Sequence, residues 1–401
     1  MDSHHPNQFA LFRTARFLPL FITQAIGAFN DNAFRYALSI LIIYDLSQRS
    51  GVNGPLMNTL AAGLLTIPFF LFSATAGQLA DKFDKAWLAT RIKFFEIFIL
   101  ALASFSLYTA QIWLQLFCVF LTGTQSAFFG PIKYSILPQH LEKNELLGGN
   151  GLIEMGTFLS VLLGTLFGGF FILWGSESGR HMVSVVMVAL SVGAFLAARR
   201  IPPAPAPRPD LVMYPNIIAE TWRVISIARD RSDVFLAILG ISWFWFLGVV
   251  FLTQIPLFTH DNIHADETVA NLIIAVFSIA IGVGSVVTNR LLKGEVSVKY
   301  VPVAAILITV FSIDLFFAAE SLRTNAPADA LLTPFVLLSL FSGWRVLIDL
   351  GLIAFCAGLF VVPLYAVVQT RSAPPRRARV IAANNIINAI FMTVATLCCI
   401  G

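Results

Sequence analysis

The sequence predicts an all-α polytopic membrane protein, on two observations. Hydrophobic residues make up 57% of the 401 residues, whereas charged residues make up only 12%. Soluble domains carry about 25% charged residues, so this composition excludes the soluble classes. Apolar runs of about 20 residues, the length that crosses a bilayer as a helix, also follow one another along most of the chain.

Eleven such runs are predicted to cross the membrane. The first set lies near 17–46, 55–80, 87–109, 112–137, 147–173 and 181–199, and the second near 234–259, 267–292, 299–319, 346–370 and 379–401. A shorter apolar piece, 331–341, is predicted to be a re-entrant or interfacial helix before the tenth span. Because two equal halves need an even number of spans, we expect a twelfth span to be missing from a truncated chain.

The two sets of spans predict three parts. Residues 1–199 form an N-terminal six-helix bundle, 200–233 a linker, and 234–401 an incomplete C-terminal bundle of five spans. Five prolines fall between residues 202 and 209, so the linker begins as an extended segment. Ile217, Ile218, Trp222 and Ile225 follow at helical spacing, which predicts an amphipathic helix on a membrane surface.

The lysines and arginines predict the orientation. When alternate loops are assigned to one side, 20 of the 26 basic residues fall there and four fall on the opposite side. Arg35 and Lys133 remain inside spans. Since basic residues gather on the cytoplasmic side, the N-terminus and the linker are predicted to be cytoplasmic.

Charged residues at membrane depth are the first candidates for function. Lys133 and Glu154 lie in consecutive spans, on either side of a predicted loop that carries Pro138 and the glycines at 148, 149 and 151. A charge in hydrocarbon costs about 3 kcal/mol, so it marks a pathway or a partner. Asp31 lies about 21 Å along the first span, and Arg35 is one turn further, where it is able to pair with Asp31.

These residues fit two interpretations. They form structural ion pairs between spans, or they bind a zwitterionic headgroup, with Lys133 or Arg35 on phosphate and Asp31 or Glu154 on ammonium. Weaker polar candidates share a place within apolar runs: Gln24, Gln254, Asn384 and Asn385. For the asparagines, hydrogen bonding between helices is the alternative.

The loop after the second span carries a motif. Residues 77–85, GQLADKFDK, resemble the G-x-x-x-D-[RK]-x-x-[RK] signature of the major facilitator superfamily. This resemblance implies two helical bundles with a pseudo-two-fold axis, eleven of twelve spans being present. It also implies a conformational latch, formed here by Gly77, Asp81, Lys82 and Lys85. Asp84 departs from the pattern, because glycine is frequent at that place.

Further motifs resemble one branch of that superfamily. FNDNAFR contains Asp31, Asn32 and Arg35, GPIKYSILP and NGLIE contain Lys133 and Glu154, and VVPLYAVVQ and RVIAANNIINAIFM follow in the second half. Together they resemble the lysophospholipid transporter family, which moves lysophosphatidylethanolamine and related lipids into the bacterial cytoplasm for reacylation. The resemblance implies that Asp31, Lys133 and Glu154 belong to the polar part of the cavity, and that the protein lies in the bacterial inner membrane.

Three functions remain open at this point. The first is a lysophospholipid transporter that works by alternating access, with Asn32 completing the headgroup site. The second is a proton-coupled exporter of drugs or small amphiphiles, in which Asp31 or Glu154 carries the proton. The third is the membrane half of a phospholipid-remodelling protein, with an acyltransferase as partner or fused domain. The sequence carries no enzyme signature, so no catalytic residue, metal, cofactor or nucleic acid is predicted, and membrane lipids are the expected surroundings.

Overall fold

The computed structural model describes residues 7–43, 53–109, 111–175, 177–325 and 331–400, and these residues are almost entirely helical. The helices of the first half are α1 (Leu18–Leu41), α3 (Gly54–Lys82), α4 (Lys85–Thr109), α5 (Ile112–His140), α6 (Leu146–Ile172) and α7 (Glu177–Ala198). Those that follow are α8 (Ile217–Arg229), α9 (Ser232–Leu257), α10 (Glu267–Leu291), α11 (Val301–Asn325), α12 (Pro334–Ser339), α13 (Phe341–Arg371) and α14 (Arg377–Ile400). Short η1 (Gln8–Arg13), η3 (Phe258–Asn262) and η4 (Pro374–Arg376) complete the order.

Ten helices of the described residues are long and apolar enough to cross a membrane, which confirms the predicted fold class. The helix α1 is not among them, although its 24 residues suffice in length and it packs against α6 and α7. Its apolar run is interrupted by polar residues such as Gln24, Asn30 and Asp31. The membrane-crossing helices therefore number ten by length and composition, with α1 as a polar eleventh.

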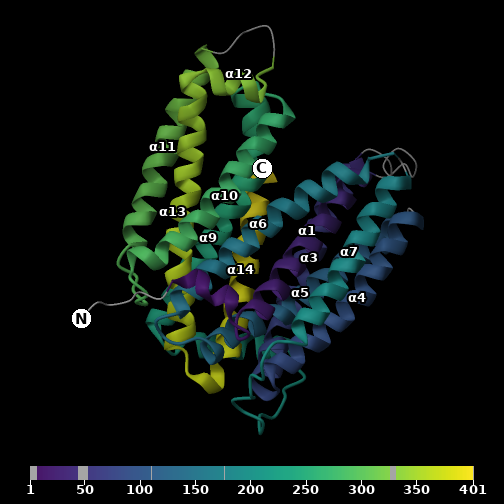
Figure 1. The fold of residues 1–401 in the computed structure, drawn as a ribbon, viewed down its shortest axis with the longest axis vertical. Coiled ribbons are helices and arrows are strands. Elements are labelled where there is room, and N and C mark those ends of the chain that lie inside the picture. The colour runs from purple at the N-terminus through teal and green to yellow at the C-terminus, as the bar shows by residue number, and fades with distance from the viewer. Residues whose placement is uncertain (1–6, 44–52, 110, 176, 326–330, 401) are drawn as a thin grey trace.

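The helices form two groups that meet at one end (Figure 1). Helices α1, α3, α4, α5 and α7 lie in one group and α9 to α13 in the other, while α6 and α14 run along the contact between them. The groups diverge toward α12, at the end opposite the segment 199–216 (Figure 1). We call the end at which they meet the linker side.

Small residues allow close contact between helices in both groups. A Cβ added at Gly168 of α6 would lie 2.2 Å from the carbonyl oxygen of Ala33 in α1. A Cβ at Gly284 of α10 would lie 2.1 Å from the carbonyl oxygen of Phe355 in α13. Only glycine permits such backbone contact, the usual basis of helix association in lipid.

The predicted loop between Lys133 and Glu154 is wrong in its extent. Pro138 lies inside α5, and the glycines at 148, 149 and 151 lie inside α6, so that the loop covers only 141–145. The glycines are needed for packing rather than for a turn. A Cβ at Gly151 would lie 2.5 Å from the carbonyl oxygen of Ser285 in α10.

The linker crosses the end of the first group before α8 begins. Residues 201–216 are not helical, and their backbone bonds to both ends of the α3–α4 turn. Lys85 N donates to Ala204 O at 3.0 Å, and Arg208 N donates to Asp81 O at 2.9 Å. The linker is thus a strap held by backbone hydrogen bonds.

The helix α8 turns part of its apolar face away from the protein, as the predicted helix on a membrane surface requires. Glu220, Val224 and Ala228 are buried, whereas Ile218 and Trp222 are 73% and 68% exposed. The buried face packs against α3 and α14. Exposed apolar residues beside charged ones are what a helix at a membrane surface presents.

An ion pair joins the segment before α1 to the start of α6. Arg16 Nη1 and Nη2 donate to the two carboxylate oxygens of Glu145 at 2.5 and 2.6 Å. Burial pushes the pKa of Glu145 upward, but the hydrogen bonds from Arg16 and from the backbone of Glu142 leave it below its ordinary value. The pair therefore stabilises the fold above the ordinary glutamate pKa, and this contribution is lost as the pH falls through the lower pKa of the folded state.

Replacing Glu145 with glutamine is expected to lower the free energy of unfolding by about 1 kcal/mol at pH 7. The difference from wild type should vanish once the pH falls well below about 4. Thermal unfolding in detergent at several pH values measures it, with the exposed Glu295→Gln as a control that leaves stability unchanged. A difference that persists at low pH would contradict the ion-pair explanation.

Candidate functional site

Asp31 lies in the middle of α1 and faces α5. Ser126 Oγ donates to Asp31 Oδ2 at 2.5 Å. Arg35 Nη2 instead donates to Asn32 Oδ1 at 3.2 Å. The prediction that Asp31 pairs with Arg35 is therefore wrong. Among the described residues these two side chains form no ion pair, because each is hydrogen-bonded to a different residue. Asp31 as a whole residue is half-buried.

A buried ion pair lies one turn of α1 away from Asp31. Lys93 and Glu96 of α4 are each 1% exposed, and Lys93 Nζ lies 2.5 Å from Glu96 Oε2. A Cβ added at Gly27 would lie 2.5 Å from Lys93 Nζ, so the pair fills the space that this glycine leaves. The ammonium also lies 4.6 Å from the ring centroid of Phe129 in α5.

The charge count along the sequence places Lys93 with the loop residues, and the structure corrects this. Lys93 lies in the third turn of α4, and its chain is buried against α1 and α5. Glu96 lies three residues further inside the same apolar run, so the sequence predicts a local pair between Lys93 and Glu96, and the structure confirms this pair. Such a pair at membrane depth is a functional candidate by the argument used for Lys133.

A tyrosine connects the two charged residues of the α5–α6 hairpin. Tyr134 Oη donates to Glu154 Oε1 at 2.5 Å, and the ammonium of Lys133 lies 4.5 Å from the Tyr134 ring centroid. Glu154 is fully buried and Lys133 half-buried. The Tyr134 ring stacks on Tyr365 of α13, with centroids 4.4 Å apart and planes 7° apart. Trp245 Nε1 of α9 donates to the Tyr365 hydroxyl at 3.1 Å.

This chain of contacts runs from Glu154 of α6 through Tyr134 in the first helical group to Trp245 in the second. The motifs around residues 133 and 365 contain both tyrosines, but sequence reasoning selected only the charged residues beside them. Spacing within one motif does not show that two rings from distant segments stack. The hairpin is therefore part of the contact between the groups.

Three of the four weaker polar candidates lie against a neighbouring helix. Gln24 Nε2 donates to the carbonyl oxygen of Ile153 at 3.4 Å, which joins α1 to α6. The Asn385 amide lies against Gly130 of α5, where a Cβ would approach its nitrogen to 2.5 Å. Asn384 is buried beside Tyr365. Gln254 lies in the last turn of α9, three residues before its end, and is half-buried.

The predicted latch residues lie where α3 meets α14. Asp81 Oδ2 accepts from Arg379 Nε at 2.9 Å, and its Oδ1 accepts from Ala378 N at 3.2 Å. Asp81 is fully buried and Arg379 is 3% exposed. A Cβ at Gly77 would lie 2.8 Å from the Ala382 Cβ, so glycine permits the close approach. The carboxylate therefore caps the first turn of α14 and also neutralises its arginine.

The remaining residues of this motif hold the turn and the strap. Asp84 accepts from Trp87 N at 2.9 Å and from Ala204 N at 2.8 Å, so the aspartate that departs from the motif caps α4 and binds the linker. Lys85 is 2% exposed and lies near Asp81. Lys82 is half-buried beside Phe83.

A pair of amides forms a second contact between the groups on the linker side. Asn150 Nδ2 of α6 donates to Gln369 Oε1 of α13 at 2.7 Å, and Gln369 Nε2 donates back to Asn150 Oδ1 at 2.9 Å. Both residues are fully buried. Sequence reasoning missed them, although both belong to the quoted motifs, because neither carries a charge.

The arrangement as a whole combines charges of both signs with contacts that close one end. Asp31, Lys133 and the Lys93–Glu96 pair come from α1, α4 and α5, and Glu154 from α6. The Asp81–Arg379 and Asn150–Gln369 contacts lie on the linker side. The charges therefore lie mainly inside the first helical group, and the two closing contacts join it to the second.

Comparisons with known proteins agree with this arrangement. The family model described as the Major Facilitator Superfamily matches residues 20–396. The Lysophospholipid transporter LplT of Serratia proteamaculans is 26% identical over 360 residues, which cover 87% of this chain and 78% of the relative. The protein of the same name from Pectobacterium carotovorum is 28% identical over 368 residues, covering 87% and 77%.

Solved structures are similar in fold at low sequence identity. The human organic anion transporter MFSD10 has a TM-score of 0.68 at 12% identity, covering 98% of this chain and 93% of that one. A bacterial homologue of the iron transporter ferroportin, in its outward-facing state, has a TM-score of 0.64 at 13% identity, with coverages of 95% and 91%. These likenesses concern the fold alone.

Proposed function

Because the chain belongs to the Major Facilitator Superfamily, we propose that it moves lysophospholipids across the bacterial membrane by alternating access between its two helical groups. The observation that carries the proposal is the set of buried and half-buried charges inside the helices, on Asp31, Lys93, Glu96, Lys133 and Glu154. Charges in hydrocarbon are costly unless they serve a pathway or a partner.

A lysophospholipid headgroup matches these charges. The phosphate of lysophosphatidylethanolamine needs a cation. Lys133 is half-buried, its ammonium lies 4.5 Å from the Tyr134 ring centroid, and it makes no ion pair within 4 Å among the described residues. The ammonium needs an anion, and the Asp31 carboxylate is a candidate. Ser126 donates a hydrogen bond to its Oδ2 atom, which leaves Oδ1 for the ammonium. The names of the LplT relatives support the same substrate class.

The basic residues support an orientation in which the linker side faces the cytoplasm. In this orientation, the Asp81–Arg379 and Asn150–Gln369 contacts close the cytoplasmic end. The lysolipid then enters from the outer leaflet, and an acyltransferase that restores its second chain consumes the transported product.

Uptake of a radiolabelled lysophosphatidylethanolamine into spheroplasts that lack their own lysolipid transporter tests this proposal. Wild type is expected to take up the lipid, while Lys133→Ala and Asp31→Asn each reduce uptake at least about tenfold, the loss of one hydrogen bond to a charged group. Arg290→Ala, at the exposed end of α10, is the matched control and should transport normally.

Two results would count against the proposal. Normal uptake by both site variants would exclude these residues as the headgroup site. No uptake by well-folded wild type, together with proton-dependent efflux of amphiphiles that Asp31→Asn abolishes, would favour the exporter instead.

A further inference from the structure

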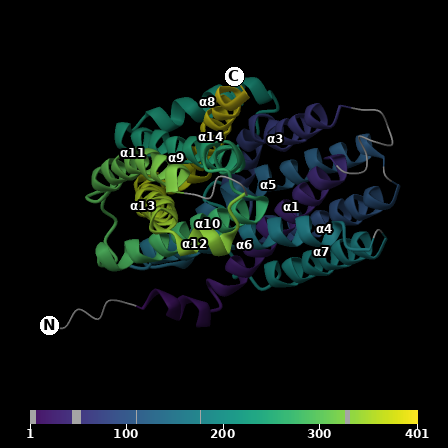
Figure 2. The same ribbon diagram turned by 90° about the horizontal axis from the view of Figure 1, so that it is seen from above.

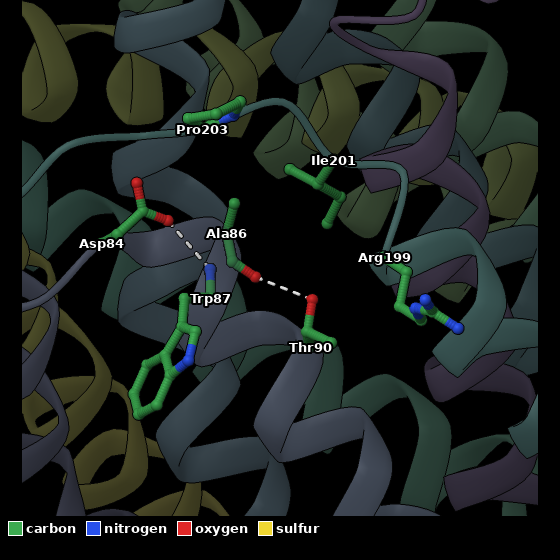
Figure 3. A pocket seen from close by; sticks show the side chains of 7 residues that line it. All are labelled: Asp84, Ala86, Trp87, Thr90, Arg199, Ile201 and Pro203. Carbon is green, nitrogen blue, oxygen red and sulfur yellow. Dashed lines mark hydrogen bonds between the residues drawn. The ribbon is translucent and has the colours of Figure 1, made fainter.

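A pocket of about 490 Å³ lies at the linker-side end of α4 and α7. Figure 3 shows its lining side chains around an open centre. They include Asp84, Trp87, Thr90, Arg199, Ile201 and Pro203. No charged residue of the proposed substrate site lines it, so this pocket requires a separate explanation.

Asp84 and Arg199 line the pocket, so its lining carries one charge of each sign, and Arg91 adds a positive charge beside Trp87. The Asp84 carboxylate already accepts two backbone N–H groups, from Trp87 and Ala204. Arg199 is exposed and makes no ion pair among the described residues, its guanidinium lying 6.0 Å from the Phe195 ring centroid. Arg91, also exposed, lies 5.3 Å from the ring of Trp87. Arg91 is not among the residues that line the pocket, but it contacts the lining residue Trp87, so two guanidinium groups against one carboxylate favour an anion such as phosphate.

An aromatic strip continues from the pocket along the outside of the protein. Phe94 lies 5.6 Å from Phe195 and 5.1 Å from Phe98, measured between ring centroids. Phe98 is 58% exposed and Trp87 is 50% exposed. Helices α4 and α7 form an outer edge of the first group (Figures 1 and 2). A half-exposed tryptophan between charged and apolar surface is typical of a membrane interface.

We propose that this pocket binds the phosphate headgroup of an anionic phospholipid from the leaflet on the linker side. Arg199 and Arg91 contact the phosphate, Trp87 marks the interface, and an acyl chain lies along Phe94, Phe98 and Phe195. The aromatic strip is the reason for choosing a lipid over free phosphate, which has no apolar part to bury. The bound lipid contacts α4, α7 and the strap at once, and it is distinct from the transported substrate.

Native mass spectrometry of the purified protein with added phosphatidylglycerol tests the proposal. Arg199→Ala and Arg91→Ala are each expected to weaken retention of this lipid about fivefold, the effect of one basic residue near an anionic lipid surface. Arg199→Lys should keep most of the binding. Arg290→Ala, an exposed arginine at the end of α10, is the matched control and should bind as wild type does.

Two further measurements distinguish a lipid phosphate from free phosphate and test whether the charge of the lipid matters. Phosphatidylcholine should be retained more weakly than phosphatidylglycerol, and inorganic phosphate at equal concentration should not displace the lipid. Equal retention of both lipids, displacement by inorganic phosphate, or equal loss in Arg290→Ala would overturn the proposal. Because native mass spectrometry observes the folded protein as an intact ion, it also shows whether a variant has failed to fold. If Arg199→Ala fails to fold, lipid retention by Arg199→Lys is compared with that by Arg91→Ala. Equal retention by these two variants would then overturn the proposal.

Discussion

Replacing Glu96 with alanine is expected to destabilise the protein by about 3–5 kcal/mol, because it leaves the ammonium of Lys93 buried without its anion. Both side chains are only 1% exposed, and Lys93 is enclosed by Gly27 of α1 and Phe129 of α5. Water does not reach the lysine to replace the lost carboxylate. Thermal unfolding in detergent, followed by loss of the monodisperse species, measures the effect.

A double variant separates stability from function at this pair. Lys93→Met combined with Glu96→Leu replaces both charges by apolar side chains of similar volume, so stability should return to near that of wild type. If the pair also helps to set the charge around Asp31, lysolipid uptake by the stable double variant should still fall. A Glu96→Ala protein as stable as wild type would contradict the burial argument.

Replacing Asp81 with alanine is expected to open the linker side. The change leaves the nearly buried guanidinium of Arg379 without a counter-ion and the first turn of α14 without its cap. If the substitution destabilises the state with a closed linker side by about 3 kcal/mol and leaves the open state unchanged, the ratio of open to closed protein rises about 100-fold. Distances between spin labels on the linker-side ends of α3 and α14 should therefore lengthen.

Asp210→Ala is the control for this shift. Asp210 lies in the linker on the same side, but it is largely exposed and its carboxylate is 3.9 Å from Arg208. Its removal should leave the distance distribution unchanged, since exposed pairs contribute little. If Asp81→Ala also leaves the distribution unchanged, Asp81 is a structural cap rather than a conformational latch.

The helices could be predicted because each is encoded by one continuous apolar run. The first run shows the limit of this argument, since α1 is a helix of sufficient length whose polar residues take it below the hydropathy of the others. The short helix α12 before the tenth span is also where the apolar piece at 331–341 predicts one. Turns were less predictable, because the glycines at 148, 149 and 151 serve packing between helices.

The candidate site was predictable only in part. The charges at 31, 133 and 154 stand out in hydrocarbon, but their partners do not follow from spacing. Asp31 bonds to Ser126, which is 95 residues away, rather than to Arg35 one turn along. The uncharged Tyr134–Tyr365 stack and the Asn150–Gln369 pair could not be recognised, since each joins segments more than 200 residues apart.

The sequence by itself determined that this protein is a helical membrane protein, because hydropathy is a local property, and the resemblance of residues 77–85 to the major facilitator signature indicated its family. The tertiary structure alone decided which charges are paired and which groups close the linker side. Lys93 illustrates the difference, since the sequence predicts its local pair with Glu96 but not that both side chains are buried beside Gly27. Whether a buried charge stabilises or destabilises the folded state depends on the groups around it, and those groups come from adjacent helices.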